Sequence, residues 1–387
     1  MSKTQATQTF VPKVADAARV VSWIHIGDLH MTRAGEQNDL DLEAIVNEIN
    51  TAFADAVSFV YLPGDVADDG SCAAYAVVRQ SLDRLRAPWC AILGDHDVHE
   101  KSFANFLDSM ARQTHYAFTV GDTRFLAMNA FDIPDPKSFA VLPQQMQWLE
   151  VQLENASARG QSKVLLLHCY PSDLKAGSEE LCKLVQKYGA RLIDMGHTHY
   201  NEIANDGRTI YTATRSTGQI EEGPVGFSVI NLDGDVVSWH FLELWDLPAV
   251  MITSPSDERL MTRSSLVHSP ARDGIRVRAK VWDIVEIQRV RAKLEEQHLE
   301  LRRVPGSQVW EAIIPTNHMP DGVYSLHVHA QDTDGRTAGD AIRVTVGAAV
   351  MPPRKRFDRD QDNALAAWPE HGLLGTQLGP NKNGRKW

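Results

Sequence analysis

Five short apolar runs of the sequence each end in a cluster that contains aspartate or histidine. In chain order the clusters are Asp28-Leu29-His30, Gly64-Asp65, Gly94-Asp95-His96-Asp97, His168 and Gly196-His197-Thr198-His199. One such cluster alone is usually a turn or a hydrogen-bonded structural residue. Five such clusters together indicate a common binding site, because burying so many polar groups without partners costs several kcal/mol for each group. Metal ions held jointly by the clusters would satisfy all of them.

The types of side chain narrow the chemistry of such a site. The seven candidate ligands are Asp28, His30, Asp65, Asp95, His168, His197 and His199. Imidazole and carboxylate without thiolate favour Mn²⁺ or Fe, with Zn²⁺ as a further candidate. Seven ligands are too many for one ion and predict two ions that share a bridging carboxylate. Two ions ~3.5–4 Å apart form the clamp used for in-line displacement at phosphorus.

The apolar runs before the clusters predict strands buried on both faces, because they lack polar alternation. The runs cover residues 20–26, 57–62, 89–93, 164–167 and 190–195. Helical patterns lie between them at residues 40–54, 73–85, 144–155 and 178–188. Strands that alternate with helices indicate an α/β layer fold, in which ligands bind at the carboxyl ends of the strands. The clusters occupy those ends.

The remaining sequence predicts antiparallel strands. Asp-Gly or Gly-Asp turns predict hairpins over residues 115–129, 202–213 and 227–244. Residues 246–270 are irregular and rich in Ser and Pro, which is typical of a linker. Strand patterns at 274–282, 312–315, 323–331 and 337–346 then predict a small β-sandwich.

We therefore expect five parts of the chain. They are an N-terminal extension (1–19), a catalytic domain (20–248), a linker (249–270), a β-sandwich domain (271–350) and a C-terminal tail (351–387). The tail carries a surplus of basic residues on an acidic protein. We hypothesise that it docks on the catalytic domain, with Trp368 and Trp387 as anchors.

Composition excludes several classes of protein. The chain has 387 residues and a formal net charge of −11, so no nucleic acid is expected as a stable partner. No apolar run approaches the ~20 residues of a membrane helix, and the first residues lack a secretory pattern. The four cysteines lack C-x-x-C spacing. We expect a cytoplasmic protein with reduced thiols that does not interact with membranes.

The ordered clusters resemble the signature of calcineurin-like metallophosphoesterases, over residues 20–245. The flanking Trp23-Ile24-His25-Ile26 and His115-Tyr116-Ala117-Phe118 resemble the bacterial class III cyclic-nucleotide and glycerophosphodiester phosphodiesterase branch. The resemblance implies a four-layer α-β-β-α sandwich, which here precedes a small C-terminal all-β sandwich.

The resemblance also implies roles for single residues. The first metal ion would be held by Asp28, His30, Asp65 and His199, and the second by Asp65, Asp95, His168 and His197, with Asp65 as the bridge. A hydroxide between the ions would attack phosphorus. His96 would stabilise the transition state or protonate the leaving oxygen, and Asp97 would orient it. His25 is expected beneath the site.

Asp95 departs from the family pattern, which usually has Asn at this position. With two divalent ions and one hydroxide, a third carboxylate makes the cluster formally neutral. A neutral cluster favours a monoanionic diester over a dianionic monoester, or recruits a trivalent ion such as Fe³⁺. The alternative is that Asp95 is an isosteric ligand of unchanged function.

These inferences predict a metal-dependent phosphodiesterase that acts on a small phosphoester. The alternatives are a phosphomonoesterase of the same family and a scaffold that kept the fold without the chemistry. A third alternative makes the β-sandwich the binding module, although it shows no aromatic stripe or basic patch. The sequence is also compatible with a homo-oligomer. Weaker candidates for substrate contact are Arg33, His99, His115, Tyr116, Tyr170, Tyr200 and the rim loop 131–136.

Overall fold

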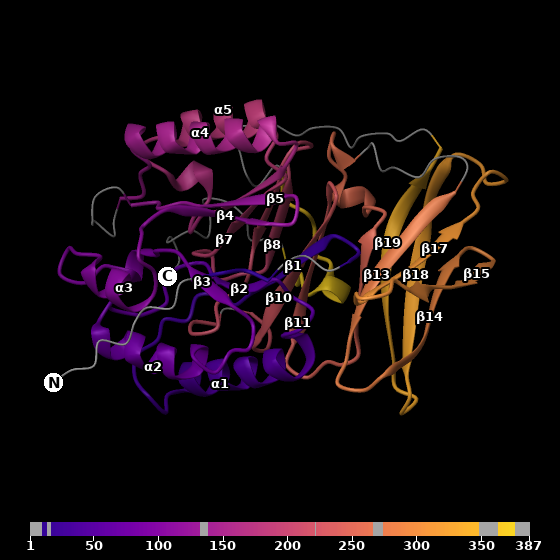
Figure 1. Cartoon of the computed structure of the whole chain (residues 1–387), viewed down its shortest axis with the longest axis horizontal. Coiled ribbons are helices and arrows are strands. Elements are labelled where there is room, and N and C mark those ends of the chain that lie inside the picture. The colour runs from indigo at the N-terminus through magenta and orange to yellow at the C-terminus, as the bar shows by residue number, and fades with distance from the viewer. Residues whose placement is uncertain are drawn as a thin grey trace.

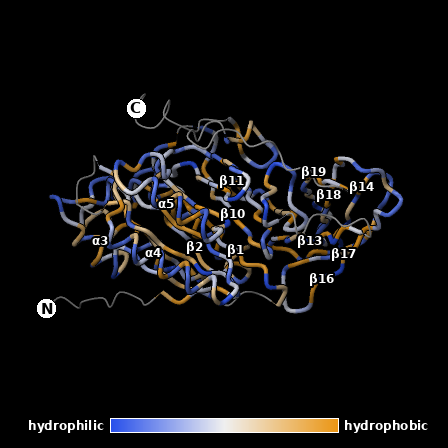
Figure 2. Tube along the Cα trace, turned by 90° about the horizontal axis from the view of Figure 1, so that it is seen from above, coloured by the Kyte–Doolittle hydropathy of each residue, from blue (hydrophilic) through white to orange (hydrophobic). Residues whose placement is uncertain are grey.

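The computed structural model describes residues 10–13, 17–131, 138–220, 222–265, 274–347 and 363–375. Figure 1 shows an N-terminal domain of two sheets between two sets of helices, beside a domain made of strands alone. In Figure 2 the apolar segments gather in the interior around β1, β2 and β10, and polar segments lie at the periphery. No helix of the described residues is long and apolar enough to cross a lipid bilayer.

The first sheet carries three of the predicted Asp/His clusters. Its strand order is β11-β10-β1-β2-β3, comprising β11 (Val236–Glu243), β10 (Gly226–Asp233), β1 (Val20–His25), β2 (Phe59–Leu62) and β3 (Trp89–Ala91). Strands β1, β2 and β3 run parallel, and the hairpin β10–β11 extends them in antiparallel fashion. Every residue of β1 and β2 is buried, as their unbroken apolar runs predict.

The second sheet carries the other two clusters. Its order is β4-β5-β6-β7-β9-β8, comprising β4 (Tyr116–Val120), β5 (Thr123–Ala127), β6 (Ser162–Leu166), β7 (Leu192–Met195), β9 (Ile210–Ala213) and β8 (Glu202–Asn205). The predicted hairpins are confirmed as β4–β5 and β8–β9. The two sheets pack face to face through aromatic rings: Phe125 lies 5.3 Å from Trp23 and 5.1 Å from Phe59, centroid to centroid.

Helices cover the outer faces of both sheets. On one side lie α1 (Gln37–Glu48), which continues into a π-helical turn over Ile49–Phe53, and α2 (Cys72–Leu82); on the other lie α4 (Pro143–Ala158) and α5 (Ser178–Tyr188). The four helices match the predicted helical patterns, and the expected α-β-β-α order of layers is confirmed. The short α3 (Ala104–Ser109) was not predicted, because six residues carry too little periodicity.

The C-terminal domain is a pair of antiparallel sheets. One has the order β12-β13-β17-β16, comprising β12 (Ala249–Ser254), β13 (Ile275–Trp282), β17 (Val309–Ile314) and β16 (Arg302–Arg303). The other has the order β15-β14-β18-β19, comprising β15 (Gln297–Glu300), β14 (Ile287–Leu294), β18 (Gly322–Asp332) and β19 (Thr337–Val346). The all-β sandwich is therefore confirmed, with more strands than the sequence indicated.

The structure corrects the start of the linker and supports the docking of the tail. The prediction that the linker begins at residue 249 is wrong, because Ala249–Ser254 form β12 and pair with β13. The strand was not predicted because its short apolar run lies between Pro248 and Pro255, in a segment that is otherwise irregular. The hypothesis that the tail docks on the catalytic domain is supported for residues 363–375: Leu365 N–H donates to the carbonyl oxygen of Ile203 over 2.8 Å, and Trp368 is buried. Trp387 and residues 266–270 of the expected linker lie outside the described residues.

Candidate metal centre

The seven predicted ligands converge at one edge of the two packed sheets. Asp28 and His30 follow β1, Asp65 follows β2, Asp95 follows β3, His168 follows β6, and His197 and His199 follow β7. All five strands are parallel members of their sheets, so their carboxyl ends meet at the same edge. Clusters that are far apart in the sequence therefore form one site.

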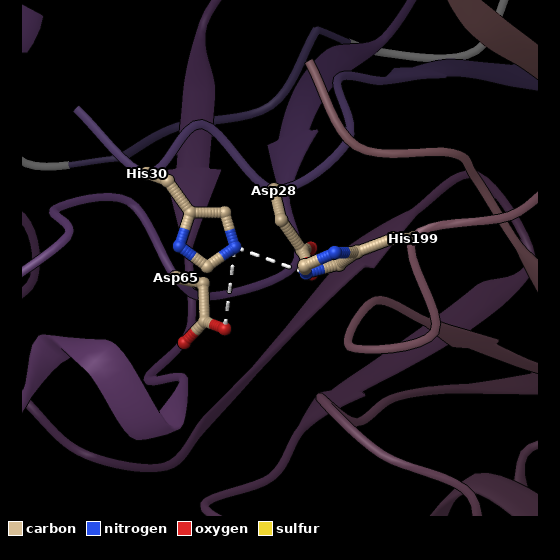
Figure 3. Close-up of side chains that lie close together, drawn as sticks. All are labelled: Asp28, His30, Asp65 and His199. Atoms are coloured by element: carbon tan, nitrogen blue, oxygen red, sulfur yellow. Dashed lines mark hydrogen bonds and ion pairs between the residues drawn. The ribbon is translucent and has the colours of Figure 1, made fainter. Parts of the chain in front are cut away.

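Asp28, His30, Asp65 and His199 form the first group, with one ligand atom of each within 4.8 Å of the others. Figure 3 shows the two imidazoles and Asp65 turned toward a common point. His30 Nε2 lies 3.0 Å from His199 Nε2 and 3.8 Å from Asp65 Oδ2. His199 Nε2 lies 3.7 Å from Asp28 Oδ2. Lone pairs of four side chains thus face one position, as a cation requires.

Asp65, Asp95, His168 and His197 form the second group. His168 Nε2 lies 3.2 Å from Asp95 Oδ1 and 3.5 Å from Asp65 Oδ2, and His197 Nδ1 lies 3.4 Å from Asp95 Oδ1. Asp65 Oδ2 therefore faces His30 of the first group and His168 of the second. The other oxygen, Oδ1, accepts the backbone N–H of His96 over 2.8 Å. This division leaves Oδ2 as the oxygen positioned to bridge two ions.

The site contains buried carboxylates that bound cations would stabilise. Asp28 Oδ1 is buried without a hydrogen-bond partner among the described residues. An unsatisfied buried group of this kind costs about 1–3 kcal/mol, and more when it is charged. Three carboxylates lie together in the two groups and repel each other. The Asp and His donor set fits two divalent ions, which would neutralise the repulsion and use the free oxygen.

Protonation states in the site agree with ligand function at two positions. Burial and neighbouring Asp95 act to raise the pKa of Asp65, but His168 and His30 outweigh them and lower it to about 2. Burial lowers the pKa of His199 to about 4. An ionised carboxylate and a neutral imidazole are the forms that bind metals. In addition, His168 Nδ1 lies 2.8 Å from the carbonyl oxygen of Pro63, which places the proton on Nδ1 and directs Nε2 into the site.

The backbone around the ligands is strained. His30, Asp65, His197 and His199 have positive φ angles of 42°, 47°, 66° and 62°. Non-glycine residues in this region cost about 1–3 kcal/mol each and cluster at functional sites. Gly94 is required for a different reason: a Cβ there would lie 2.1 Å from the backbone nitrogen of Asp65. The backbone conformation that brings these side chains together is therefore destabilising by itself.

A buried pair supports the site from below. His25 on β1 lies with Nδ1 2.8 Å from Asp194 Oδ1 on β7, and both side chains are buried. Asp194 also accepts hydrogen bonds from Trp23 Nε1 and Thr212 Oγ1, each over 2.9 Å. The pair links the two sheets whose strand ends carry Asp28 and His197. The expectation that His25 packs beneath the site is confirmed.

His96 and Asp97 do not form the predicted pair. His96 Nδ1 lies 2.8 Å from the carbonyl oxygen of Asp68, and its side chain is 39% exposed at the rim of the site. Asp97 is fully buried and accepts hydrogen bonds from the N–H groups of Gly94 and Ala67 and from the Tyr75 hydroxyl. The prediction that Asp97 orients His96 is therefore wrong.

The reason lies in the local backbone. His96 and Asp97 are neighbours in a 3₁₀ turn over Asp95–Asp97, where successive side chains point ~120° apart. In this turn the His96 side chain lies at the rim of the site, while the Asp97 side chain is fully buried. Asp97 instead fastens together the loops after β2 and β3, and burial and Asp65 raise its pKa to about 6.

Asp68 is the functional candidate that sequence reasoning missed. Its Oδ1 lies 3.4 Å from His30 Nδ1 and 3.5 Å from His96 Nδ1. The signal was available in the order Gly64-Asp65-Val66-Ala67-Asp68, which places a second carboxylate three residues after the bridging one. A carboxylate next to a metal-ligating histidine orients the imidazole and raises its basicity.

The weaker candidates for substrate contact belong to neither group of candidate ligands. Arg33 is exposed and pairs with Glu36, and His99 Nδ1 lies 2.9 Å from the carbonyl oxygen of Asp69. His115 packs against Trp148 and, with Tyr116, lines a separate cavity of about 580 Å³ that contains none of the seven ligands.

Tyr170 and Tyr200 follow metal blocks but belong to neither ligand group, and Tyr170 is buried. Residues 132–136 of the expected rim loop lie outside the described residues. Downstream of that loop, the Phe139 ring lies 4.8 Å from that of His197 and forms an apolar contact beside the second group.

Comparison with known proteins supports the same interpretation. Residues 22–201 match the family model described as calcineurin-like phosphoesterase. A probable cyclic nucleotide phosphodiesterase of Synechococcus sp. is 26% identical over 197 residues, which cover 48% of this chain and 75% of that protein. A probable glycerophosphodiester phosphodiesterase of Arcobacter nitrofigilis is 25% identical over 197 residues, 46% of this chain and 71% of that protein.

Two further proteins complete the comparison. The 3′,5′-cyclic adenosine monophosphate phosphodiesterase CpdA of Escherichia coli is 26% identical over 196 residues, 47% of this chain and 68% of that protein. Among solved structures, a dimetal phosphatase from Danio rerio aligns over 58% of this chain and 97% of that chain, with a TM-score of 0.50 and 16% identity. At this identity the structural match shows a common fold alone.

Proposed function

Residues 22–201 form a domain of the calcineurin-like metallophosphoesterase family, and from this premise we propose that the protein is a dinuclear metal-dependent phosphodiesterase. The position of Asp65 carries the proposal. Its Oδ2 faces His30 and His168, so a single oxygen belongs to both groups of candidate ligands. When bound, two divalent ions lower the pKa of water and offset negative charge on phosphoryl oxygens.

His96 is the residue placed to serve the leaving group. The carbonyl oxygen of Asp68 accepts a hydrogen bond from Nδ1, which fixes the proton there and leaves Nε2 as the atom that gives a proton to the departing oxygen. The ring stands 4.6 Å from that of His30, beside the first group of ligands, and is accessible to a substrate. An imidazole acid contributes most when the leaving group is an alkoxide.

Two observations favour diesters over monoesters. The similar proteins named above are called cyclic nucleotide or glycerophosphodiester phosphodiesterases. Asp95 supplies a third carboxylate, which makes the centre less attractive to a dianion. We propose a small phosphoester as the substrate. The complete set of ligands, together with His96, argues against a scaffold that has lost its chemistry.

Metal analysis and turnover test this function together. We expect at least two equivalents of Mn, Fe or Zn per chain, and faster hydrolysis of bis(p-nitrophenyl) phosphate than of p-nitrophenyl phosphate. Chelation should abolish activity and leave the circular dichroism spectrum largely unchanged, because the ligands sit at strand ends of a formed core. Active, unchelated protein with less than one metal per chain would contradict the dinuclear centre. Faster hydrolysis of the monoester would contradict the phosphodiesterase assignment and indicate a phosphomonoesterase.

A further inference from the structure

A second group of histidine and aspartate lies where three segments of the chain meet. His240 belongs to β11 of the N-terminal domain, Asp340 to β19 of the sandwich, and His371 to a 3₁₀ turn over Pro369–His371 in the C-terminal segment 363–375. Figure 1 shows this segment, in yellow, between the strands of the two domains. All three side chains are buried, with 6%, 6% and 3% exposure.

The three side chains converge as closely as the ligands of the candidate centre. Asp340 Oδ1 lies 2.9 Å from His371 Nε2 and 3.4 Å from His240 Nε2. One ligand atom of each residue lies within 4.8 Å of the other two. The corresponding distances in the candidate centre run from 3.0 Å between His30 and His199 to 3.8 Å between His30 and Asp65.

Hydrogen bonds within the protein do not account for the whole group. Asp340 Oδ2 accepts the N–H of Ile252 over 2.6 Å, and Oδ1 faces both imidazoles. His240 Nε2 and His371 Nδ1 are buried and make no hydrogen bond among the described residues. Leaving such atoms unsatisfied is unfavourable. The nitrogens that face Asp340 Oδ1, Nε2 of His240 and Nε2 of His371, can each offer a lone pair to a cation.

The nearby arginine does not neutralise Asp340. The Arg259 guanidinium lies 3.4 Å from the centroid of the Trp368 ring, which stacks on the ring of His371. Both Nε and Nη2 of Arg259 donate to Asp257 over 2.8 Å, so its charge is committed to a different carboxylate. Asp340 is therefore a buried carboxylate that, among the described residues, pairs with two imidazole side chains. That donor set suits a borderline divalent ion.

We propose that His240, Asp340 and His371 bind a third divalent metal ion, of the Zn²⁺ class, that clamps the C-terminal segment to both domains. Each ligand comes from a different part of the chain, so an ion at this position joins all three. Binding free energy at such a site becomes stability of the docked segment, because the ligands are assembled only when the segment is in place.

The clamp also reaches the loop of the candidate centre. Asn201 Nδ2 donates to the carbonyl oxygen of Gly372 over 2.8 Å, one residue after His371. Asn201 lies two residues after His199, and its Oδ1 accepts the N–H of Arg215 over 2.9 Å. Leu365 N–H donates to Ile203 nearby. The segment therefore fastens the chain immediately downstream of a predicted metal ligand.

Zinc stoichiometry of the full-length protein tests the proposal. We expect His371→Gln and His240→Gln each to bind one equivalent less than the wild type. Asp65→Asn, which changes the candidate centre, should still lose one further equivalent when combined with His371→Gln. His329→Gln, an exposed histidine of the same sandwich, is the matched control and should bind as the wild type does.

Equal zinc content in the wild type and both folded single variants would overturn the proposal and leave a hydrogen-bonded His-Asp-His network. Hydrogen exchange supplies a second readout that does not depend on activity. Zn²⁺ should slow exchange of the Leu365 and Leu373 amides at least tenfold in the Asp65→Asn protein and leave it unchanged in Asp65→Asn/His371→Gln. Equal slowing in both proteins would also overturn it. Because the candidate centre is altered in both, this result is independent of the proposed function.

Discussion

Nδ1 of His96 lies 2.8 Å from the backbone carbonyl oxygen of Asp68 and 3.5 Å from a carboxylate oxygen of the same residue. The contact fixes the ring at the rim of the candidate centre with Nε2 free to act. It also connects the imidazole to His30, since Asp68 Oδ1 lies 3.4 Å from His30 Nδ1. One carboxylate therefore serves a candidate acid and a candidate metal ligand.

Replacing His96 should slow hydrolysis to a different extent for different leaving groups. We expect His96→Ala to slow diesters with alkoxide leaving groups about 10²–10³-fold, because only these need a proton at departure. Activated aryl diesters should lose less than about tenfold. The measurement is kcat/KM for a matched alkyl and aryl pair at saturating metal. Equal losses for both would assign His96 to charge stabilisation or positioning.

Asp68 should act through its two histidine neighbours. Asp68→Asn keeps the backbone carbonyl that holds His96 but removes the anionic oxygen. We expect metal affinity to fall about 10–100-fold, as for other residues that support metal-bound imidazoles. At saturating metal, kcat for the alkyl diester should also fall, with KM unchanged. Asp69→Asn alters a neighbouring aspartate outside both ligand groups and is the control. Unchanged metal affinity and kcat would make Asp68 a surface residue.

Asp95 tests whether the charge of the centre sets specificity. Asp95→Asn removes one negative charge from the second group of ligands, so a dianionic monoester gains more attraction than a monoanionic diester. The ratio of kcat/KM for diester to monoester should fall, and binding of a trivalent ion should weaken. Metal content is measured for both proteins. If occupancy is complete and the ratio does not change, Asp95 is only a spatial substitute for Asn.

Glu48 makes stability depend on pH. It is buried at the end of α1, where Trp245 N–H donates to it over 2.9 Å, and burial raises its pKa to about 7. Because the folded-state pKa exceeds the usual value, its contribution is fully present below about pH 4.5 and is lost as pH rises through 7.

Glu48→Gln keeps an acceptor for Trp245 and removes the charge. Relative to the wild type it should gain about 1–2 kcal/mol in free energy of unfolding between pH 5 and pH 8, after allowance for solvent screening. Urea denaturation at both pH values measures the difference. Glu43→Gln on the same helix, whose side chain is exposed, should show no such change. A Glu48 variant that behaves like the control would contradict the pKa shift.

The sequence by itself predicted the candidate centre and the layers that position it. Unbroken apolar runs predict parallel strands with both faces covered, and the carboxyl ends of parallel strands meet at one edge. For that reason the sequence predicts that Asp28, Asp65 and His168, which are far apart in the chain, lie close together. Turn chemistry likewise predicted the hairpins, since Asp-Gly and Gly-Asp pairs act locally.

Other features depended on contacts that no local pattern encodes. The direction of His96 and Asp97 follows from the 3₁₀ turn that separates neighbouring side chains, so adjacency in sequence suggested the wrong pair. Strand β14 reads as a polar segment because its exposed face carries Arg and Lys while the other face packs in the sandwich.

The meeting of His240, Asp340 and His371 required the docking of three segments, each of which contributes a single residue to the group. Periodicity reports which face of an element is buried. Only tertiary structure decides what that face meets, because the partner is set by packing between segments far apart in the chain.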